Sequence, residues 1–265
     1  MKKINNIFLK KKILIYGLGK SGISTYNFLR QKAKVNLFDD NPKNNFRFDK
    51  KNLSLAKILQ SFFDFIIISP GIDVSKCKLS KYLKQNSSKV YTDLDVFCTF
   101  FSNDSVTITG TNGKSTTAKL LYDVLSDQKK DARLVGNIGN PILSEKKITK
   151  KTFFVIEASS YQLEYSKIFK SKYSVILNIT PDHIERHKSF KNYIKAKFRL
   201  IDSQSTKSVA FVKRNDPVIV KKLRSKKYKQ KIVKIDTSLQ PPIFKKIRNT
   251  YFMSSGNREN LIFVL

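Results

Sequence analysis

Short apolar runs alternate along this chain with amphipathic stretches, an order that is typical of an α/β protein. Toward the N-terminus, apolar runs predict buried strands over residues 12–16, 35–38 and 65–68. After the first run, Ile23, Tyr26 and Leu29 recur on one side of a stretch that ends near Gln31, and this spacing predicts a helix. The same reasoning predicts four later strands and one long helix: strands over 106–109, 153–156, 174–177 and 208–212, and a helix over 189–201. Strands that alternate with helices indicate parallel, doubly wound sheets, whose ligands bind beyond the carboxyl ends of the strands.

The chain of 265 residues is long enough for two domains, each with its own core. A second strand–loop–helix unit begins near Asn103, so we predict a Rossmann-like domain over 1–102 and a phosphate-loop domain over 103–265. The lysine-rich stretch from Lys221 to Lys234 is interpreted as a solvated helix and a strand with its turn.

The composition narrows the class of protein only slightly. The formal net charge is +32, but lysine greatly exceeds arginine and tryptophan is absent, a bias that fits codon composition better than a nucleic-acid surface. Lys10–Lys12 interrupt the apolar start, and no apolar run reaches the ~18–20 residues that span a bilayer. We therefore expect a cytoplasmic monomer that binds neither nucleic acid nor membrane. Cys77 and Cys98 lack metal-type spacing and are expected to be reduced thiols.

A phosphate-binding loop follows the strand at 106–109. Its Gly-Lys-Ser ending and helix start would bring backbone N–H groups and a lysine to phosphate oxygens, while a serine hydroxyl can ligate magnesium. The predicted ATP-binding residues are Gly110, Thr111, Asn112, Gly113, Lys114, Ser115 and Thr116. The two glycines are closer together than in the common Walker loop, and the variant is one that Mur and folylpolyglutamate ligases use.

Polar residues follow two later buried strands. Glu157 ends one strand and begins Glu157–Glu164, where a carboxylate facing the phosphate loop could hold magnesium; taken alone, it would be a surface acid. Asn178–His187 follows the next strand, and His183 shares that strand end with an asparagine and an aspartate. Lys197, on the amphipathic helix, would by itself be an ordinary solvated lysine.

Together these motifs resemble the Mur ligases, and among them the ligases that add D-glutamate to UDP-N-acetylmuramoyl-L-alanine. The resemblance runs from Gly17 to about Ala210 and includes Ser69–Ile72 and Gly136–Gly139. The Glu-x-Ser-Ser-Tyr-Gln-Leu-Glu stretch separates this group from the related ligases for other amino acids. The resemblance implies an ATP-dependent ligase of peptidoglycan synthesis that works through an acyl phosphate.

The resemblance also implies roles for individual residues. Lys114, His183 and Lys197 would be catalytic, with Lys197 carbamylated by carbon dioxide. Magnesium would be held by Ser115, Glu157, His183 and the Lys197 carbamate. The UDP-muramoyl substrate would contact Gly17, Leu18, Gly19, Lys20 and Asp39 in the first domain and Asn137 and Ser159 in the second.

The pattern departs from the family near its end. A glycine-histidine-asparagine element appears only as Ser255–Asn260, with Gly256 in the histidine position. The third family domain, which binds D-glutamate, is not in these residues, so we expect the 265-residue chain alone not to complete the ligation.

Three alternatives remain open. One is a non-catalytic fragment that binds UDP-muramoyl substrate or ATP. Another is a NAD-binding oxidoreductase, because Gly17-x-Gly19-x-x-Gly22 with Asp39 fits a dinucleotide fingerprint but leaves the second loop unexplained. A third is a folylpolyglutamate synthetase, which shares the ATP loop but not this first domain.

Overall fold

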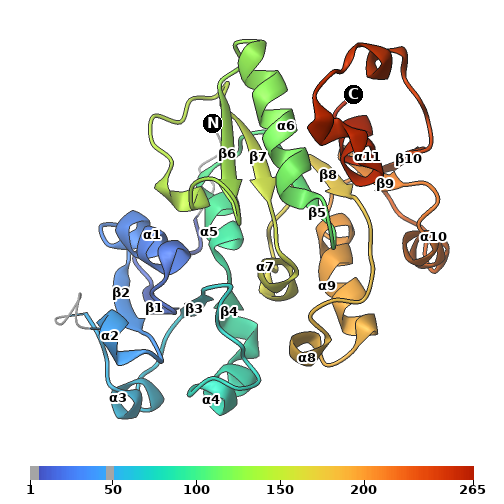
Figure 1. Cartoon of the computed structure of the whole chain (residues 1–265). Helices are drawn as coiled ribbons and strands as arrows, with labels where there is room; N and C mark the ends of the chain where they lie inside the picture. Colours follow the sequence, from blue (N-terminus) through green and yellow to red (C-terminus); the bar gives the residue numbers. More distant parts are fainter. Residues whose placement is uncertain (1–5, 46–50) are drawn as a thin grey trace. The chain divides into compact units, whose positions relative to one another are not determined.

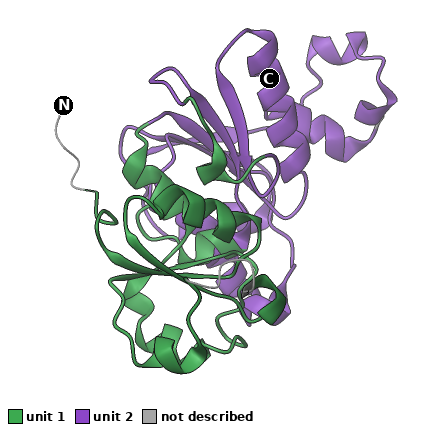
Figure 2. Cartoon of the chain, turned by 90° about the vertical axis from the view of Figure 1, so that its left-hand side faces the viewer, with its two compact units in different colours: residues 1–102, 140–147, 161–169 green, residues 103–139, 148–160, 170–265 purple. Residues whose placement is uncertain are grey.

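The computed structural model describes residues 6–45 and 51–265 and divides the chain into two compact units (Figure 2). Unit 1 comprises residues 1–102, 140–147 and 161–169. Unit 2 comprises residues 103–139, 148–160 and 170–265. The predicted sequence domains, 1–102 and 103–265, stay a prediction; the compact units differ from them by the two short later segments that belong to unit 1.

Unit 1 contains a parallel sheet of strand order β2-β1-β3-β4 (Figure 1). Its strands are β1 (Lys12–Tyr16), β2 (Lys34–Phe38), β3 (Phe65–Ile68) and β4 (Val90–Tyr91). Its helices are α1 (Lys20–Leu29), α2 (Pro42–Asn45), α3 (Leu55–Leu59), α4 (Ser80–Gln85), α5 (Asp93–Phe100) and the 3-10 turns η2 (Ser87–Lys89) and η3 (Ile142–Ser144). The central strands are almost continuously buried, as expected of a parallel sheet covered on both faces.

The segment 161–169 joins unit 1 through a buried carboxylate on α5. The fully buried Asp95 accepts backbone N–H bonds from Lys167, Ile168 and Phe169 at 2.9, 2.8 and 3.0 Å, and a hydroxyl bond from Ser166 at 3.0 Å. Helix α7 (Ser160–Tyr165) forms the first part of this segment. The Asp95 carboxylate thus fixes the path of the chain just after the predicted Glu157 motif.

Unit 2 is built on a parallel sheet of order β10-β9-β8-β5-β7-β6 (Figure 1). Its strands are β5 (Ser105–Thr109), β6 (Ala132–Gly136), β7 (Phe153–Glu157), β8 (Tyr173–Ile176), β9 (Val209–Lys213) and β10 (Lys231–Ile235). Its helices are α6 (Lys114–Asp127), α8 (Ile184–His187), α9 (Phe190–Asp202), α10 (Pro217–Arg224), α11 (Ser255–Ile262) and the 3-10 turns η4 (Pro242–Lys246) and η5 (Thr250–Met253). The predicted fold class, parallel α/β in both parts, is confirmed.

Two cores cover the two faces of this sheet. Val175 belongs to the core shared with α6, whereas the next residue of β8, Ile176, belongs to the core shared with α9 and α10. Successive side chains of a strand point to opposite faces, so one continuous apolar run serves both cores. The carboxyl ends of β5, β7 and β8 are thereby fixed, and the predicted polar motifs follow these ends. No helix among the described residues combines the length and the hydrophobicity needed to cross a bilayer.

Candidate active site

The phosphate loop connects β5 to α6 and is shaped by both backbone and side-chain contacts. Gly113, immediately before α6, has a φ of +83°, a left-handed conformation that glycine adopts without strain. The Asn178 side chain accepts N–H bonds from Thr111 at 3.1 Å and Asn112 at 2.9 Å. The loop is therefore anchored to the end of β8.

Lys114 lies inside this loop. Its ammonium group donates to the Thr111 carbonyl at 2.8 Å. Burial lowers the pKa of Lys114 below its ordinary value, and the negative charges of Glu157 and Asp182 partly oppose that shift. A phosphate group would add negative charge beside this half-buried ammonium, and this makes the loop electrostatically suited to a polyphosphate.

Glu157 is the centre of a hydrogen-bonded group at the carboxyl ends of β5 and β7. Its side chain is fully buried. One carboxylate oxygen accepts from the Ser115 hydroxyl at 2.8 Å, and the other accepts from the Asn137 amide at 2.9 Å. The neighbouring Ser159 is half-buried on the loop that leaves β7. The structure thus brings together three residues that the sequence placed in three separate motifs.

Lys197 is buried, with an exposed fraction of 1%, and this overturns the solvated position that its sequence context alone would suggest. Its ammonium group donates to the Gly110 carbonyl at 2.6 Å and lies over the Tyr193 ring at 4.6 Å from the centroid. Burial lowers the pKa of Lys197 to about 7, and the nearby Lys114 charge adds to the shift while Asp182 and Glu157 oppose it. A substantial fraction of this amine is neutral at pH 7.

His183 is placed differently. It is exposed, has a φ of +52°, and its Nε2 lies 3.3 Å from an Asp182 carboxylate oxygen. Within residues 6–45 and 51–265, no three His, Cys, Asp or Glu side chains cluster as a metal site. The donors that do meet, the Glu157 carboxylate and the Ser115 hydroxyl, are oxygen ligands of the type that magnesium prefers. The residues present therefore fit one magnesium ion at Glu157, while the His183 assignment stays a prediction.

The glycine loop of unit 1 is held by Asp39 at the end of β2. Its carboxylate accepts the N–H of Leu18 at 2.5 Å and the N–H of Asn41 at 2.8 Å. The Leu18 side chain is buried, whereas Gly19 and Lys20 are exposed. Gly19 and Lys20 are thus the exposed positions of this loop, and the Asp39 carboxylate shapes it; the predicted contacts of residues 17–20 and Asp39 with the UDP group stay a prediction.

The third glycine of this loop has a packing role. A Cβ atom at Gly22 would lie 1.8 Å from the Gly17 carbonyl oxygen, so α1 approaches the loop as closely as glycine allows. The Ser69 hydroxyl donates to the same carbonyl at 2.7 Å. The Ser69–Ile72 motif therefore supports the glycine loop directly.

The sequence did not predict that α11 contacts the phosphate loop. A Cβ atom at Gly113 would lie 2.1 Å from the amide oxygen of Asn260, which is buried. On the preceding turn, the Tyr251 hydroxyl lies 3.0 Å from the Thr116 hydroxyl. Asn260 lies in the Ser255–Asn260 element that the sequence marked as a departure from the family, but nothing in that element indicated a contact with the loop.

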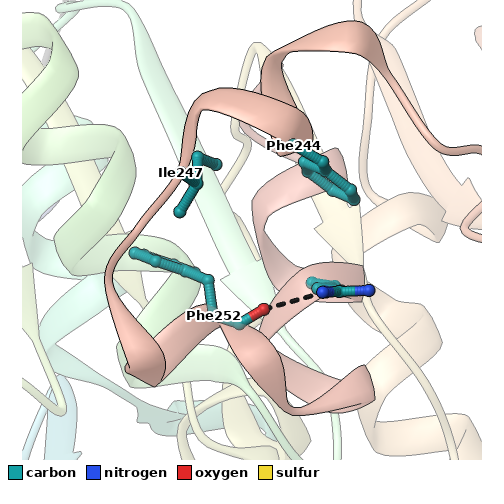
Figure 3. Close-up of a pocket in the computed structure, with 4 residues that line it drawn as sticks. Phe244, Ile247 and Phe252 are labelled. Atoms are coloured by element: carbon teal, nitrogen blue, oxygen red, sulfur yellow. Dashed lines mark hydrogen bonds between the residues drawn. The ribbon is translucent and has the colours of Figure 1, made fainter.

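A small pocket lies in the same C-terminal part of unit 2. Phe244, Ile247, Phe252 and Arg258 line it, and the Arg258 Nε donates to the Phe252 carbonyl at 3.0 Å (Figure 3). None of the predicted site residues lines this pocket. Three of its four lining side chains are apolar and come from the segment between β10 and α11, and Arg258 comes from α11 itself.

Two family models match this sequence. The Mur ligase middle domain matches residues 108–261, which is more than half of the chain. The chain belongs to the Mur ligase family. The MurD-like N-terminal domain of Mur ligases matches residues 11–90. The family resemblance inferred from the motifs is thereby confirmed.

Individual relatives place the chain more closely within the Mur ligases. A UDP-N-acetylmuramoylalanine–D-glutamate ligase from Rickettsia bellii is 36% identical over 212 residues, which cover 78% of this chain and 46% of the relative. The ligase of the same name from Thermoanaerobacter sp. is 32% identical over 265 residues, which cover 95% of this chain and 58% of the relative. The chain spans about half the length of the curated relatives it matches.

A solved Mur ligase structure shares the fold. It is the UDP-N-acetylmuramate:L-alanyl-gamma-D-glutamyl-meso-diaminopimelate ligase from Neisseria meningitides, with a TM-score of 0.53 and 14% identity, covering 84% of this chain and 77% of its own. At this identity the likeness shows the architecture alone.

Proposed function

We propose that this chain carries the ATP-binding and UDP-muramoyl-binding parts of a ligase that adds D-glutamate to UDP-N-acetylmuramoyl-L-alanine in the cytoplasm. The observation that carries the proposal is the buried Glu157 carboxylate, hydrogen-bonded to Ser115 and Asn137 beside the phosphate loop. The relatives named as D-glutamate ligases supply the substrate class. A dinucleotide-binding oxidoreductase would leave this second loop without a purpose.

ATP would bind with its phosphates in the loop that begins at Gly110. Lys114 would exchange its contact with the Thr111 carbonyl for the outer phosphates, because a half-buried cation gains more from an anion than from a dipole. Glu157 and Ser115 would hold magnesium, which supplies positive charge to the phosphates when bound.

Lys197 would become a carbamate. A neutral amine nitrogen attacks the carbon of carbon dioxide and loses a proton, and the lowered pKa supplies that neutral form near pH 7. The product is a carboxylate-like anion within the field of Lys114, so a buried and partly neutral amine would be replaced by an anion beside a cationic group. His183 would join it at a second metal only in the ligand-bound state.

The reaction then follows from charge placement. The carboxylate of the muramoyl-alanine substrate attacks the γ-phosphorus of ATP, the bond to ADP breaks, and an acyl phosphate forms. The D-glutamate amine attacks the acyl carbon, phosphate leaves with the electron pair of the C–O bond, and the amine loses a proton. Lys114 would offset the negative charge that gathers on the transferred phosphoryl group. Asn137 and Ser159 would contact the muramoyl-alanine part of the substrate.

Unit 1 would hold the UDP group with its glycine loop. A Cβ at Gly19 meets nothing within 4 Å, so Gly19→Asp should fold normally while placing a carboxylate where the diphosphate binds. The matched control is Gly256→Asp on α11, where a Cβ also meets nothing within 4 Å. In calorimetry, UDP-N-acetylmuramoyl-L-alanine should bind the wild type and the control but bind Gly19→Asp at least tenfold more weakly.

Nucleotide and acceptor preferences test the proposal as a whole. Calorimetry should show that magnesium strengthens ADP binding and that Glu157→Gln abolishes this strengthening. The L-alanine form of UDP-N-acetylmuramate should bind more tightly than the form without alanine. Binding of NADH in preference to ADP, or magnesium-independent ADP binding in the wild type, would overturn the assignment.

A further inference from the structure

We propose that His187 is a positioning residue that holds the segment after β7 in register with the phosphate loop, by contacting Ser160 and Tyr193. The inference rests on the proposed function, because the segment after β7 begins at the expected magnesium ligand. None of the roles that the family resemblance implies involves His187.

The first contact joins two buried side chains. The His187 Nε2 lies 3.0 Å from the Ser160 hydroxyl, and the exposed fractions are 2% for His187 and 4% for Ser160. Ser160 begins α7, only three residues after Glu157 ends β7. A hydrogen bond between buried groups at this point limits how far the backbone after Glu157 can move, since breaking it would leave both groups without solvent to replace it.

The second contact reaches the phosphate loop. The His187 ring packs edge-on against the Tyr193 ring, with 5.3 Å between centroids and 63° between planes. The Tyr193 hydroxyl lies 3.1 Å from the Thr111 hydroxyl, and the Lys197 ammonium lies over the same ring. One imidazole therefore touches both the segment that carries the carboxylate and the aromatic residue that supports the loop and the buried lysine.

The backbone around His187 explains why an anchor is needed. Helix α8 has four residues and lies between two left-handed residues, His183 at φ +52° and Lys188 at φ +67°. So short a helix has little stability of its own. The Asn192 amide donates to the His187 carbonyl at 2.8 Å, so the backbone and the side chain of this residue are both fixed.

The charge state of His187 suits this position. Burial lowers the pKa of the imidazole to about 4, and the positive charge of Arg186 adds to the shift. The ring is therefore neutral near pH 7 and adds no positive charge beside Lys197. An imidazole can bond to the serine hydroxyl in this neutral state, in either tautomer.

The test separates positioning from simple stability. His187→Phe keeps a ring against Tyr193 but removes the bond to Ser160, and we expect magnesium-ADP to bind about five- to tenfold more weakly, the usual range for one buried hydrogen bond. ADP binding in the presence of a chelator should change less than about twofold, because Glu157 acts only through the metal. His187→Gln, which keeps a polar group near the hydroxyl, should recover most of the loss.

Ser160→Ala gives an independent variant should His187→Phe fold poorly. It should weaken magnesium-ADP binding like His187→Phe, and the double variant should be no weaker than either single one, because both remove the same bond. The matched control is Gln204→Leu, which removes buried hydrogen bonds to Ser174 and the Val209 carbonyl elsewhere in unit 2. It should lower the melting temperature without changing the effect of magnesium.

Three outcomes would overturn the inference. Magnesium-ADP binding as tight in His187→Phe and Ser160→Ala as in the wild type would refute it while leaving the proposed function intact. Equal losses with and without magnesium, matched by Gln204→Leu, would show a role in stability alone. A wild type whose ADP binding ignores magnesium would overturn the proposed function and this inference together.

Discussion

The burial of Lys197 leads to a prediction about the pH dependence of folding stability that does not depend on any ligand. The amine is buried between the Gly110 carbonyl and the Tyr193 ring, and its pKa falls from 10.5 to about 7. Replacing it by methionine keeps much of the length and apolar volume but removes the ionisable group. Lys195→Met, on the exposed side of the same helix, is the matched control.

The sign and size follow from proton linkage. Because the pKa of Lys197 is lowered on folding, the unfolded chain binds more protons between pH 7 and pH 10.5, and the free energy of unfolding rises with pH over that window. The full shift corresponds to about 5 kcal/mol of differential stability. Between pH 7 and pH 9, the Lys197 contribution to the free energy of unfolding should rise by about 2 kcal/mol.

Urea denaturation followed by far-UV circular dichroism measures this contribution. The experiment uses buffers free of carbon dioxide. The free energy of unfolding at pH 9 minus that at pH 7 is determined for the wild type and compared with the same difference for each variant. Lys197→Met should lose about 2 kcal/mol of the pH-dependent gain, and Lys195→Met should keep it. The same gain in Lys197→Met as in the wild type would refute the idea that Lys197 is buried as a neutral amine. In a separate measurement by mass spectrometry, added bicarbonate should raise the mass of the wild type by one carbon dioxide and should leave the mass of Lys197→Met unchanged.

Three further predictions test other contacts. Gly113→Ala should weaken ADP binding by tenfold or more in calorimetry, because its Cβ would collide with the Asn260 amide, whereas Gly256→Ala should leave binding unchanged and raise the melting temperature slightly. Asp95→Asn should lower the free energy of unfolding by about 2–3 kcal/mol in urea denaturation, because an amide has a single acceptor oxygen and cannot accept both from Thr92 and from the three N–H groups of residues 167–169. Burial raises the pKa of Asp93 to about 6, so its cost to stability grows as pH rises from 4 to 6; Asp93→Asn should raise the melting temperature at pH 8 and not at pH 4 in calorimetry.

Several strands were predictable from continuous apolar runs, including β2 at the edge of its sheet. The runs predicted at 12–16 and 153–156 became β1 and β7, and both lie between other strands, so the apolar signal is continuous. Strand β6 was missed. It reads Ala-Arg-Leu-Val-Gly, a short run that an arginine interrupts and that is only partly buried, so the apolar signal is weak.

The site was predictable in its residue types but not in its contacts. Glu157, Ser115 and Asn137 could be proposed as neighbours because parallel strands end at the same edge of a sheet. The burial of Lys197 could not be read from its helix, since a lysine on an amphipathic face ordinarily reaches solvent. It follows only from the close approach of that helix to the Gly110 carbonyl.

Asp95 shows most clearly why a sequence boundary and a structural one differ. One carboxylate oxygen accepts the Thr92 N–H at 3.0 Å, a local capping contact that a Thr-x-x-Asp pattern predicts. The other oxygen accepts three N–H groups from Lys167, Ile168 and Phe169, more than seventy positions later. Only the first half of this arrangement leaves a trace in the sequence. A buried carboxylate is stable only when such donors surround it, so Asp95 depends on the later segment and also holds that segment in place. Unit 1 is therefore complete only with residues that follow the phosphate loop in the sequence.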